Sequence, residues 1–365
     1  MKLRKQKWRT APLGEICKLE YGNNLTDKMR KGGSVPVYGS AGVVGWHDKP
    51  LTNSPTLIVG RKGSVGNVFY SEIPCFPIDT TYYVEETVCK ENLRWLELFL
   101  SNFNLRQLNM ATAVPGLNRN IAHLIQIPLP PLEEQKQIAA LFQSIETAME
   151  QVDDQEKNLK ELQKTLVNGL VNTEPIFGNL LNSKNCTPTN MGAIAECDKK
   201  YPEHEKEVER FVGLENIEPE NFQLQGFGFV ANGTTFTKRF AKDDVLFGKR
   251  RAYLKKVAVA DFDGICSGDI LVIRAKANKI LQDLLPYYIS AEAFINHAVS
   301  TSAGSLSPRT KWKDLETFEI AIPDLKTEEK ILEVLQQFDR TIKQLKKQKV
   351  TLKLLKQKLL NEILE

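Results

Sequence analysis

The chain has 365 residues, of which 42% are hydrophobic and 26% charged, and a formal net charge of +4. This composition is typical of a soluble globular protein and excludes a collagen, a disordered chain and a disulfide-rich miniprotein. The length predicts about two domains, and no segment approaches the ~18 consecutive apolar residues of a membrane helix. The six cysteines are scattered and form no CxxC pair, which indicates reduced thiols and a cytoplasmic location.

The first 132 residues are predicted to form one globular body of mixed strand and helix. Short segments rich in β-branched and aromatic residues, bounded by Gly, Pro and Asp, are typical of strands. They lie at 55–60, 67–70 and 80–84, and 92–104 has the apolar spacing of a helix.

A long helix is predicted over 133–171, directly after the proline-rich segment 127–131, which cannot be helix interior. Apolar residues recur every seven positions, as in a coiled coil. One row is Ile138, Ile145, Val152, Leu159 and Leu166, and the companion row is Leu141, Ala148, Gln155, Leu162 and Gly169.

A linker at 172–188 and a second body at 189–325 follow. Strands are expected at 244–247, 257–260 and 270–273, and helical spacing runs from Ile280 to Phe294. A second long helix is predicted over 326–365. Its seam contains Ile331, Phe338, Leu345, Leu352 and Leu359, with Leu335, Ile342 and Ile363 in the companion row, which Lys349 and Lys356 interrupt.

The two long helices are predicted to pair with each other. The first has 8 acidic and 4 basic side chains between 133 and 171, and the second has 10 basic and 6 acidic between 326 and 365. Because opposite charges favour pairing between the helices over self-association, we expect an antiparallel coiled coil.

The sequence contains an internal repeat. Residues 130–146 align without gaps with 323–339, at an offset of 193, and 13–16 are similar to 191–194. Pro115–Asn118 is placed opposite Gly304–Ser307. The predicted fold class is therefore α+β, with two similar globular domains joined by two long antiparallel helices in a pseudo-twofold arrangement.

Two basic loops occupy equivalent places in the two copies. In the first, Gly60–Gly66 follows a strand and presents Arg61, Lys62 and Ser64. It lacks the GK[ST] ending of a phosphate-binding loop, and the cations suit a DNA backbone or a guanine edge. In the second, Gly248 is followed by Lys249, Arg250, Arg251 and Tyr253, and the span 238–256 holds 8 basic and 2 acidic residues.

Further candidates for DNA contact lie in polar turns. They are Tyr38, Ser40, Asn118 and Arg119 in the first copy, and Arg309 and Lys311 in the second. For all of these residues, and for the basic loops, the alternative is an ordinary solvated turn.

No catalytic constellation is evident. The four histidines are isolated and lack metal-ligand spacing, and no GxSxG or HExxH signature is present. The sequence predicts a chain that is not an enzyme by itself and holds no metal.

Several motifs, taken together, carry a family resemblance. They are Leu13–Ile16, Tyr38–Gly42, Val59–Ser64, Thr80–Tyr82, Pro115–Asn118 and Ile127–Gln135. In this order they resemble the specificity (S) subunit of type I restriction-modification systems. The resemblance covers essentially the whole chain, although the second half lacks the Gly-Arg-Lys-Gly-Ser and Pro-Gly-Leu-Asn motifs.

The resemblance implies two target-recognition domains, 1–132 and 189–325, each binding one half of a bipartite site in double-stranded DNA. The two helices would set the half-site spacing and dock two modification subunits, which carry S-adenosylmethionine and methylate adenine. Motor-nuclease subunits, with ATP and Mg, would complete the restriction complex, and this chain would hold no cofactor. The alternative is a coiled-coil scaffold whose globular domains bind protein.

Overall fold

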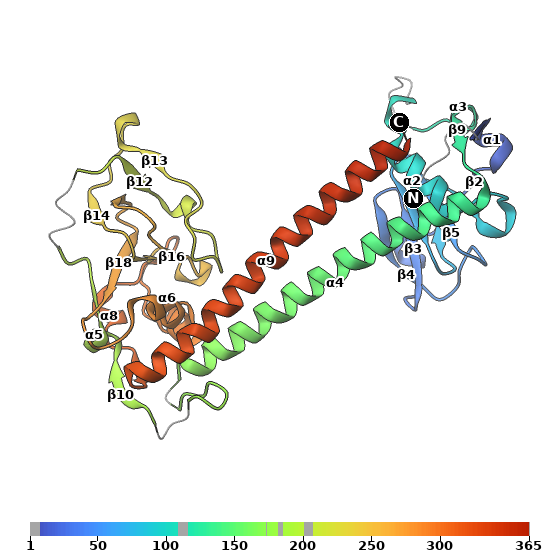
Figure 1. Cartoon of the computed structure of the whole chain (residues 1–365). Helices are drawn as coiled ribbons and strands as arrows, with labels where there is room; N and C mark the ends of the chain where they lie inside the picture. The colour runs from blue at the N-terminus through green and yellow to red at the C-terminus, as the bar shows by residue number, and fades with distance from the viewer. Residues whose placement is uncertain (1–7, 109–115, 173, 182–184, 201–206, 365) are drawn as a thin grey trace. The chain divides into compact units, whose positions relative to one another are not determined.

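The computed structural model describes residues 8–108, 116–172, 174–181, 185–200 and 207–364. The chain divides into two units: unit 1 contains 1–153 and 347–365, and unit 2 contains 154–346. Each of the two long helices, labelled α4 and α9 in Figure 1, therefore contributes residues to both units.

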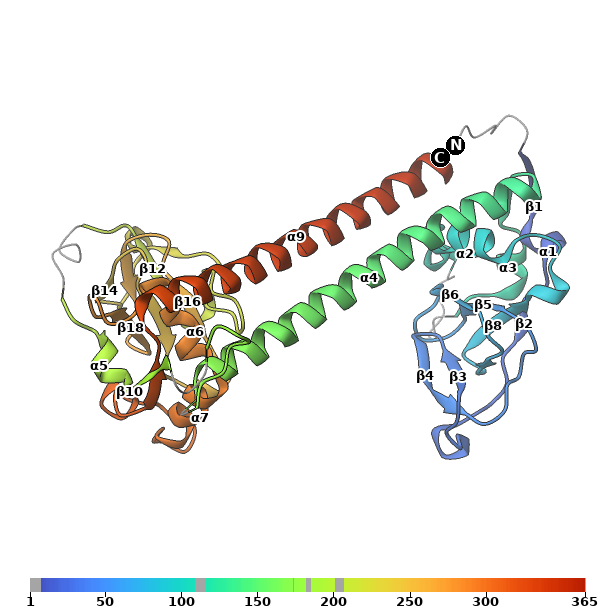
Figure 2. The same ribbon diagram turned by 60° about the horizontal axis from the view of Figure 1, so that its bottom comes forward.

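Unit 1 is built on a four-stranded sheet of order β2-β8-β5-β6, with a three-stranded sheet β4-β3-β7 and the antiparallel pair β1-β9. The β3–β4 pair lies beside the four-stranded sheet (Figure 2). The strands are β1 Arg9–Pro12, β2 Glu20–Tyr21, β3 Val35–Gly39, β4 Gly42–His47, β5 Thr56–Gly60, β6 Val68–Ser71, β7 Phe76–Pro77, β8 Thr81–Glu85 and β9 Gln126–Leu129. The helices are α1 Leu13–Ile16, η2 Asp27–Met29, η3 Glu86–Val88, α2 Leu93–Asn102, η4 Leu105–Leu108, α3 Arg119–His123 and the start of α4 Leu132–Leu170.

Unit 2 repeats this topology, as the sequence repeat predicts, with one additional strand, β14, in its second sheet. Its sheets have the orders β11-β18-β15-β16, β13-β12-β17-β14 and β10-β19. The strands are β10 Thr187–Asn190, β11 Ala195–Cys197, β12 Arg210–Val212, β13 Gly228–Phe229, β14 Lys238–Phe240, β15 Val245–Gly248, β16 Val257–Val259, β17 Gly264–Cys266, β18 Ile270–Ala275 and β19 Glu319–Ile322. The helices are α5 Met191–Ile194, η7 Leu214–Asn216, η8 Val230–Asn232, η9 Ala252–Leu254, η10 Gln282–Leu284, α6 Leu285–Ser290, α7 Glu292–Ser300, α8 Trp312–Leu315 and the start of α9 Leu325–Leu364.

The central strand of each main sheet is buried on both faces. All five residues of β5 and all four of β15 are buried, which explains their continuous apolar sequences. In unit 1, α2 covers this sheet. Its N-cap Asn92 accepts a hydrogen bond from the Trp95 amide (3.0 Å), and the buried Trp95 indole donates to the Pro128 carbonyl (3.2 Å).

Two sequence expectations for unit 2 need correction. The helix expected from Ile280 to Phe294 is interrupted, because Ala291 is extended (φ −64°, ψ 147°) between α6 and α7. The segment expected as a linker packs Phe177 and Leu181 into the core of unit 2, so this part of 172–188 belongs to the globular body.

Within unit 1 the two long helices pair antiparallel. Lys356 bonds to Glu146 (2.7 Å) and Lys349 to Asp153 (2.5 Å), so a step of seven residues up α4 is a step of seven down α9. These two lysines are the ones that interrupt the apolar row of α9. Their ammonium groups pair with α4 carboxylates, which explains how the seam tolerates them.

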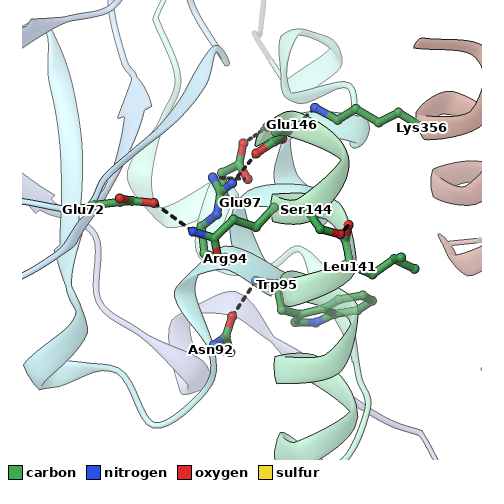
Figure 3. Close-up of polar contacts among 11 residues, drawn as sticks. Glu72, Asn92, Arg94, Trp95, Glu97, Leu141, Ser144, Glu146 and Lys356 are labelled. Atoms are coloured by element: carbon green, nitrogen blue, oxygen red, sulfur yellow. Dashed lines mark hydrogen bonds and ion pairs between the residues drawn. The ribbon is translucent and has the colours of Figure 1, made fainter. Parts of the chain in front are cut away.

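Unit 1 anchors its globular body to this helix pair through an ionic network (Figure 3). Arg94 of α2 bonds to both Glu97 and Glu146, and its guanidinium lies 5.0 Å from the Tyr70 ring centroid. Burial opposes ionisation of Glu146, but its bonds to Lys356 and Arg94 hold its pKa below the usual value. Burial raises the pKa of Glu97.

The heptad pattern predicts some positions of the buried rows and misses others. Ile138, Val152, Ile331 and Ile342 are buried as expected. Leu162, expected in the companion row, is 50% exposed. Toward the end of α4 the buried residues are Val167 and Leu170, which pack in the core of unit 2 instead of following the strict seven-residue repeat.

Glu328, in the first turn of α9, is fully buried, and its counterpart in the repeat, at the offset of 193, is the buried Gln135. Gln135 accepts from the Asn92 amide (2.9 Å) and donates to the Pro130 carbonyl (2.9 Å). Glu328 Oε2 accepts from the Leu281 amide (2.9 Å), while its Oε1 has no hydrogen-bond partner in the described part of the chain. Burial raises the pKa of Glu328 to about 7, so below that pH its side chain is mostly neutral, like that of Gln135.

Unit 2 is therefore predicted to lose stability as the pH rises. The unfolded carboxyl titrates near its ordinary pKa of about 4.3 and the folded one near 7, so the folded state binds more protons between these values. This loss is on the order of 3 kcal/mol from low to high pH. Glu328→Gln should remove that dependence in urea titrations from pH 5 to 8.5, whereas the exposed Glu333→Gln should retain it. An unchanged pH dependence in Glu328→Gln would contradict this explanation.

Candidate nucleic-acid interface

The loop that follows β5 is a tight turn built on three glycines. The Gly60 amide donates to the Asn67 carbonyl (2.7 Å), and the Gly66 amide donates to the Gly60 carbonyl (2.8 Å). Gly63 and Gly66 have φ of +75° and +80°, and a Cβ on Gly60 would lie 2.5 Å from the Ser64 carbonyl oxygen. Only glycine suits these positions, which explains the Gly-x-x-Gly-x-x-Gly spacing.

Arg61 is fixed on both sides by main-chain hydrogen bonds. Its amide donates to the Thr80 carbonyl (2.9 Å), and its carbonyl accepts from the Leu117 amide (2.9 Å). One terminal nitrogen of its guanidinium, Nη2, donates to the Asp79 carbonyl (2.8 Å). The cationic residue therefore lies between the start of β8 and the segment that leads into α3, and its side-chain position is restricted.

Tyr21 brings a second guanidinium to the same place. The Arg61 and Arg119 Cζ atoms lie 5.0 and 4.8 Å from its ring centroid, within range of a cation–π interaction. Tyr21 is 45% exposed and pairs with Tyr82 across β2 and β8. The buried Tyr82 hydroxyl donates to the Leu117 carbonyl (2.9 Å), and burial, chiefly, raises its pKa to about 12.

No sequence pattern points to Tyr21, because a lone tyrosine in a two-residue strand lies in no recognisable motif. Nor does a pattern point to Arg106, which donates to Asn67 of the glycine loop (3.3 Å).

The other predicted residues of unit 1 hold the loop and the helix in place. The Ser40 hydroxyl accepts from the Ser64 amide (3.3 Å), and the Ser40 carbonyl accepts from the Asn67 side chain (3.2 Å). Tyr38 packs near Phe69 of β6, with ring centroids 6.2 Å apart, and burial raises its pKa. The Asn118 side chain caps α3 by accepting from the amides of Asn120 and Ile121 (2.9 and 3.3 Å). Of the residues predicted from the sequence, Arg61, Lys62 and Arg119 are thus the cations at this face of unit 1.

Unit 2 repeats the main-chain pattern of this site. The Gly248 amide donates to the Lys256 carbonyl (2.9 Å) and the Lys249 amide to the Asp269 carbonyl (3.0 Å), while the Lys249 carbonyl accepts from the Thr310 amide (3.1 Å). Lys249 is therefore the counterpart of Arg61. Arg250 bridges to Arg309 as Lys62 bridges to Gly116.

These contacts correct one part of the repeat alignment. Gly116, Leu117 and Asn118 correspond to Arg309, Thr310 and Lys311, each at the offset of 193, and not to residues within Gly304–Ser307. The 304–307 segment is the tip of a hairpin, in which Ala303 and Arg309 exchange two hydrogen bonds of 3.0 Å. Pro115, at the start of the first-copy motif, lies outside the described residues.

The basic residues of unit 2 have more partners than the sequence suggests. Arg309 forms an ion pair with Asp269 (2.6 Å), whose pKa it holds below the usual value. Arg250 Nε donates to the Ser307 hydroxyl (2.8 Å), and Arg251, in the left-handed region (φ +53°), donates through its Nη2 to the Leu306 carbonyl (3.3 Å).

Two lysines of the basic span are neutralised by acidic neighbours: Lys238 pairs with Asp198 and Lys255 with Glu292, both at 2.6 Å. Of the predicted residues at this end of unit 2, Arg251, Tyr253, Arg309 and Lys311 are exposed, and Lys249 and Arg250 are half-buried.

In the described residues, no three His, Cys, Asp or Glu side chains gather closely enough to hold a metal ion. His123 accepts from the Leu19 amide (3.1 Å) and His297 bonds to the Asp314 carbonyl (2.8 Å), so both have structural partners. His204 lies outside the described residues. Over the same part of the chain, no helix combines the length and apolar character that a membrane span requires.

Comparison with known proteins decides the family. Residues 5–161 and 228–354 match the type I restriction modification DNA specificity domain. The chain belongs to this family. It is a DNA specificity subunit of a type I restriction-modification system and a non-catalytic subunit.

Individual relatives are similar to this chain along most of their length. The type I restriction enzyme EcoDI specificity subunit of Escherichia coli is 22% identical over 368 residues, covering 90% of this chain and 81% of that protein. The MjaVIII specificity subunit of Methanocaldococcus jannaschii is 24% identical over 347 residues, covering 86% and 76%. The crystal structure of the S subunit from M. genitalium matches 99% of this chain and 97% of its own, with a TM-score of 0.64 at 16% identity, and shares the fold.

Removing either guanidinium next to Tyr21 is predicted to weaken DNA binding. In the full chain assembled in its type I restriction-modification complex, Arg61→Ala or Arg119→Ala should lower the affinity for DNA. If the lost contact is to a phosphate, it should also reduce the slope of log K against log salt by about 0.9. The control is Lys90→Ala, an exposed lysine beyond the opposite end of β8. Affinity and salt slope equal to wild type in both arginine variants would exclude this face as the DNA contact.

Proposed function

We propose that each unit of this specificity subunit binds one half of a bipartite site in double-stranded DNA. Unit 1 would use the Gly60–Gly66 loop and the start of α3, and unit 2 the loop after Gly248 and the start of α8. The observation that carries this proposal is the shared main-chain pattern at Arg61 and Lys249. Two sites that share a main-chain hydrogen-bond pattern but differ in their side chains suit two half-sites of different sequence.

The proposed roles follow from the chemistry of each side chain. Arginine and lysine neutralise phosphates, and arginine also bonds to guanine through two donors. Tyr253, in the loop after Gly248 of unit 2, is 52% exposed, so its aromatic ring is available for contact with DNA. The proposed DNA-contacting residues are Arg61, Lys62, Arg119, Lys249, Arg250, Arg251, Tyr253, Arg309 and Lys311, with Tyr38, Ser40, Ser64 and Asn118 positioning or supporting them.

The long helices are proposed to dock two modification subunits, which would bind S-adenosylmethionine and methylate adenine. Val350, Leu354 and Leu355 of α9 are 56%, 67% and 43% exposed, and such apolar exposure on a helix is typical of a protein-binding face. Motor-nuclease subunits, with ATP and Mg, would complete the restriction complex. We also propose that 1–132 and 189–325 act as the target-recognition domains and that helix length sets the half-site spacing. The cytoplasmic location remains a prediction from the scattered cysteines.

Methylome sequencing tests this proposal directly. Cells that express the chain with its modification subunits should carry N6-methyladenine at a bipartite motif with a fixed gap. Cells that express either protein alone should not, because specificity and chemistry lie on different subunits. Methylation of a continuous motif, or of a motif independent of this chain, would contradict the proposal.

A further inference from the structure

Asp269 holds an arginine in a defined orientation at the proposed DNA-binding face of unit 2. It lies directly before β18, beside the end of the central strand β15. Its main chain is fixed on both sides, because its amide donates to the Ser267 hydroxyl (3.2 Å) and its carbonyl accepts from the Lys249 amide (3.0 Å). Its carboxylate accepts from Arg309 through two bonds, Nε to Oδ1 (2.6 Å) and Nη2 to Oδ2 (3.2 Å).

These two bonds use one side of the Arg309 guanidinium and leave the other available. A guanidinium has five N–H donors in a rigid plane. The carboxylate takes the side formed by Nε and Nη2. The end formed by Nη1 and the second hydrogen of Nη2 makes no other hydrogen bond among the described residues, and the side chain is 47% exposed.

The free end is a pair of parallel donors, which matches the O6 and N7 acceptors of guanine in the major groove. We propose that Arg309, oriented by Asp269, recognises a guanine in the half-site bound by unit 2. Asp269 acts as the positioning residue, and the inference rests on the proposed function of this face.

The charge of the pair favours a base over a phosphate. Arg309 and Asp269 together carry no net charge, and bonding to Arg309 keeps the Asp269 pKa low, so the carboxylate is ionised at neutral pH. An anionic phosphate gains less from Arg309 in this neutral pair than from an unpaired arginine, whereas a base edge needs only correctly oriented donors. Arg250 is the second cation near Asp269, with its Nη1 3.6 Å from Oδ2, and its Nε is occupied by Ser307.

Unit 1 has no counterpart of the Arg309–Asp269 ion pair at the equivalent positions. The main-chain contacts make Thr80 the counterpart of Asp269 and Gly116 the counterpart of Arg309. Neither residue supplies a carboxylate or a guanidinium. The guanine recognised by Arg309 is therefore expected in only one of the two half-sites.

Selection of binding sites from a random pool of duplexes tests the inference. The full chain, assembled with its modification subunits, would be compared as wild type, Arg309→Ala, Arg309→Lys and Asp269→Asn. Arg309→Lys keeps the charge but loses the planar pair of donors, and Asp269→Asn keeps the shape but loses the anion. Lys279→Ala, an exposed lysine beyond the far end of β18, is the control.

The wild-type complex and Lys279→Ala should enrich a G·C pair at one position of one half-site, by roughly 5- to 150-fold over the other pairs. Both Arg309 variants should lose that preference, Asp269→Asn should reduce it, and the other half-site should stay unchanged. A purely structural role for Asp269 would lower overall binding without altering this one position.

Two results would overturn the inference in distinguishable ways. If the wild-type complex selects a bipartite site and both Arg309 variants select the same bases, Arg309 does not recognise guanine and the proposed function stands. If the wild-type complex selects no sequence at all, the proposed function itself fails.

Discussion

The candidate interface depends on one constraint, the main-chain hydrogen bonding of the residue that follows the central strand of each sheet. In unit 1 the amide and carbonyl of Arg61 are bonded to Thr80 and Leu117, and in unit 2 those of Lys249 are bonded to Asp269 and Thr310. All four hydrogen bonds use backbone atoms only. The side chains at and around this position can therefore change without moving the backbone that presents them, which would suit the proposed binding of a different half-site by each unit.

The surroundings of this shared backbone show how far the two sites have diverged. In unit 1, Tyr21 offers an aromatic face to Arg61 and Arg119. In unit 2, Asp269 offers a carboxylate to Arg309, and the hairpin closed by Ala303 and Arg309 adds residues next to the loop. One site thus holds its guanidinium groups against a ring and the other against an anion. These environments leave different donors free for the ligand.

The sequence predicts the fold where the pattern is long or repeated. The offset of 193 between 130–146 and 323–339 extends in the structure to Gly116 and Arg309, and α4 and α9 begin one residue before the expected positions. Strands β5, β15 and β18 lie where continuous apolar runs indicate. The pattern fails where tertiary packing decides the structure. The heptad places Leu162 in the seam, but its side chain is half exposed, and Ala291 interrupts an otherwise helical spacing.

At the candidate site, the sequence predicts the cations but not their partners, because Tyr21 and Asp269 are distant in the chain from the arginines they contact. Only the fold brings them together.

The most direct test of the central claim, that two equivalent loops contact two separate half-sites, is site-specific photocrosslinking. A photoreactive amino acid would replace Lys62 in one sample and its counterpart Arg250 in another. The full chain would be assembled in its type I restriction-modification complex on DNA that carries the recognised site. The account predicts a crosslink to one half-site from position 62 and to the other from position 250. Crosslinks from both positions to the same half-site, or to DNA without regard to the site, would contradict it.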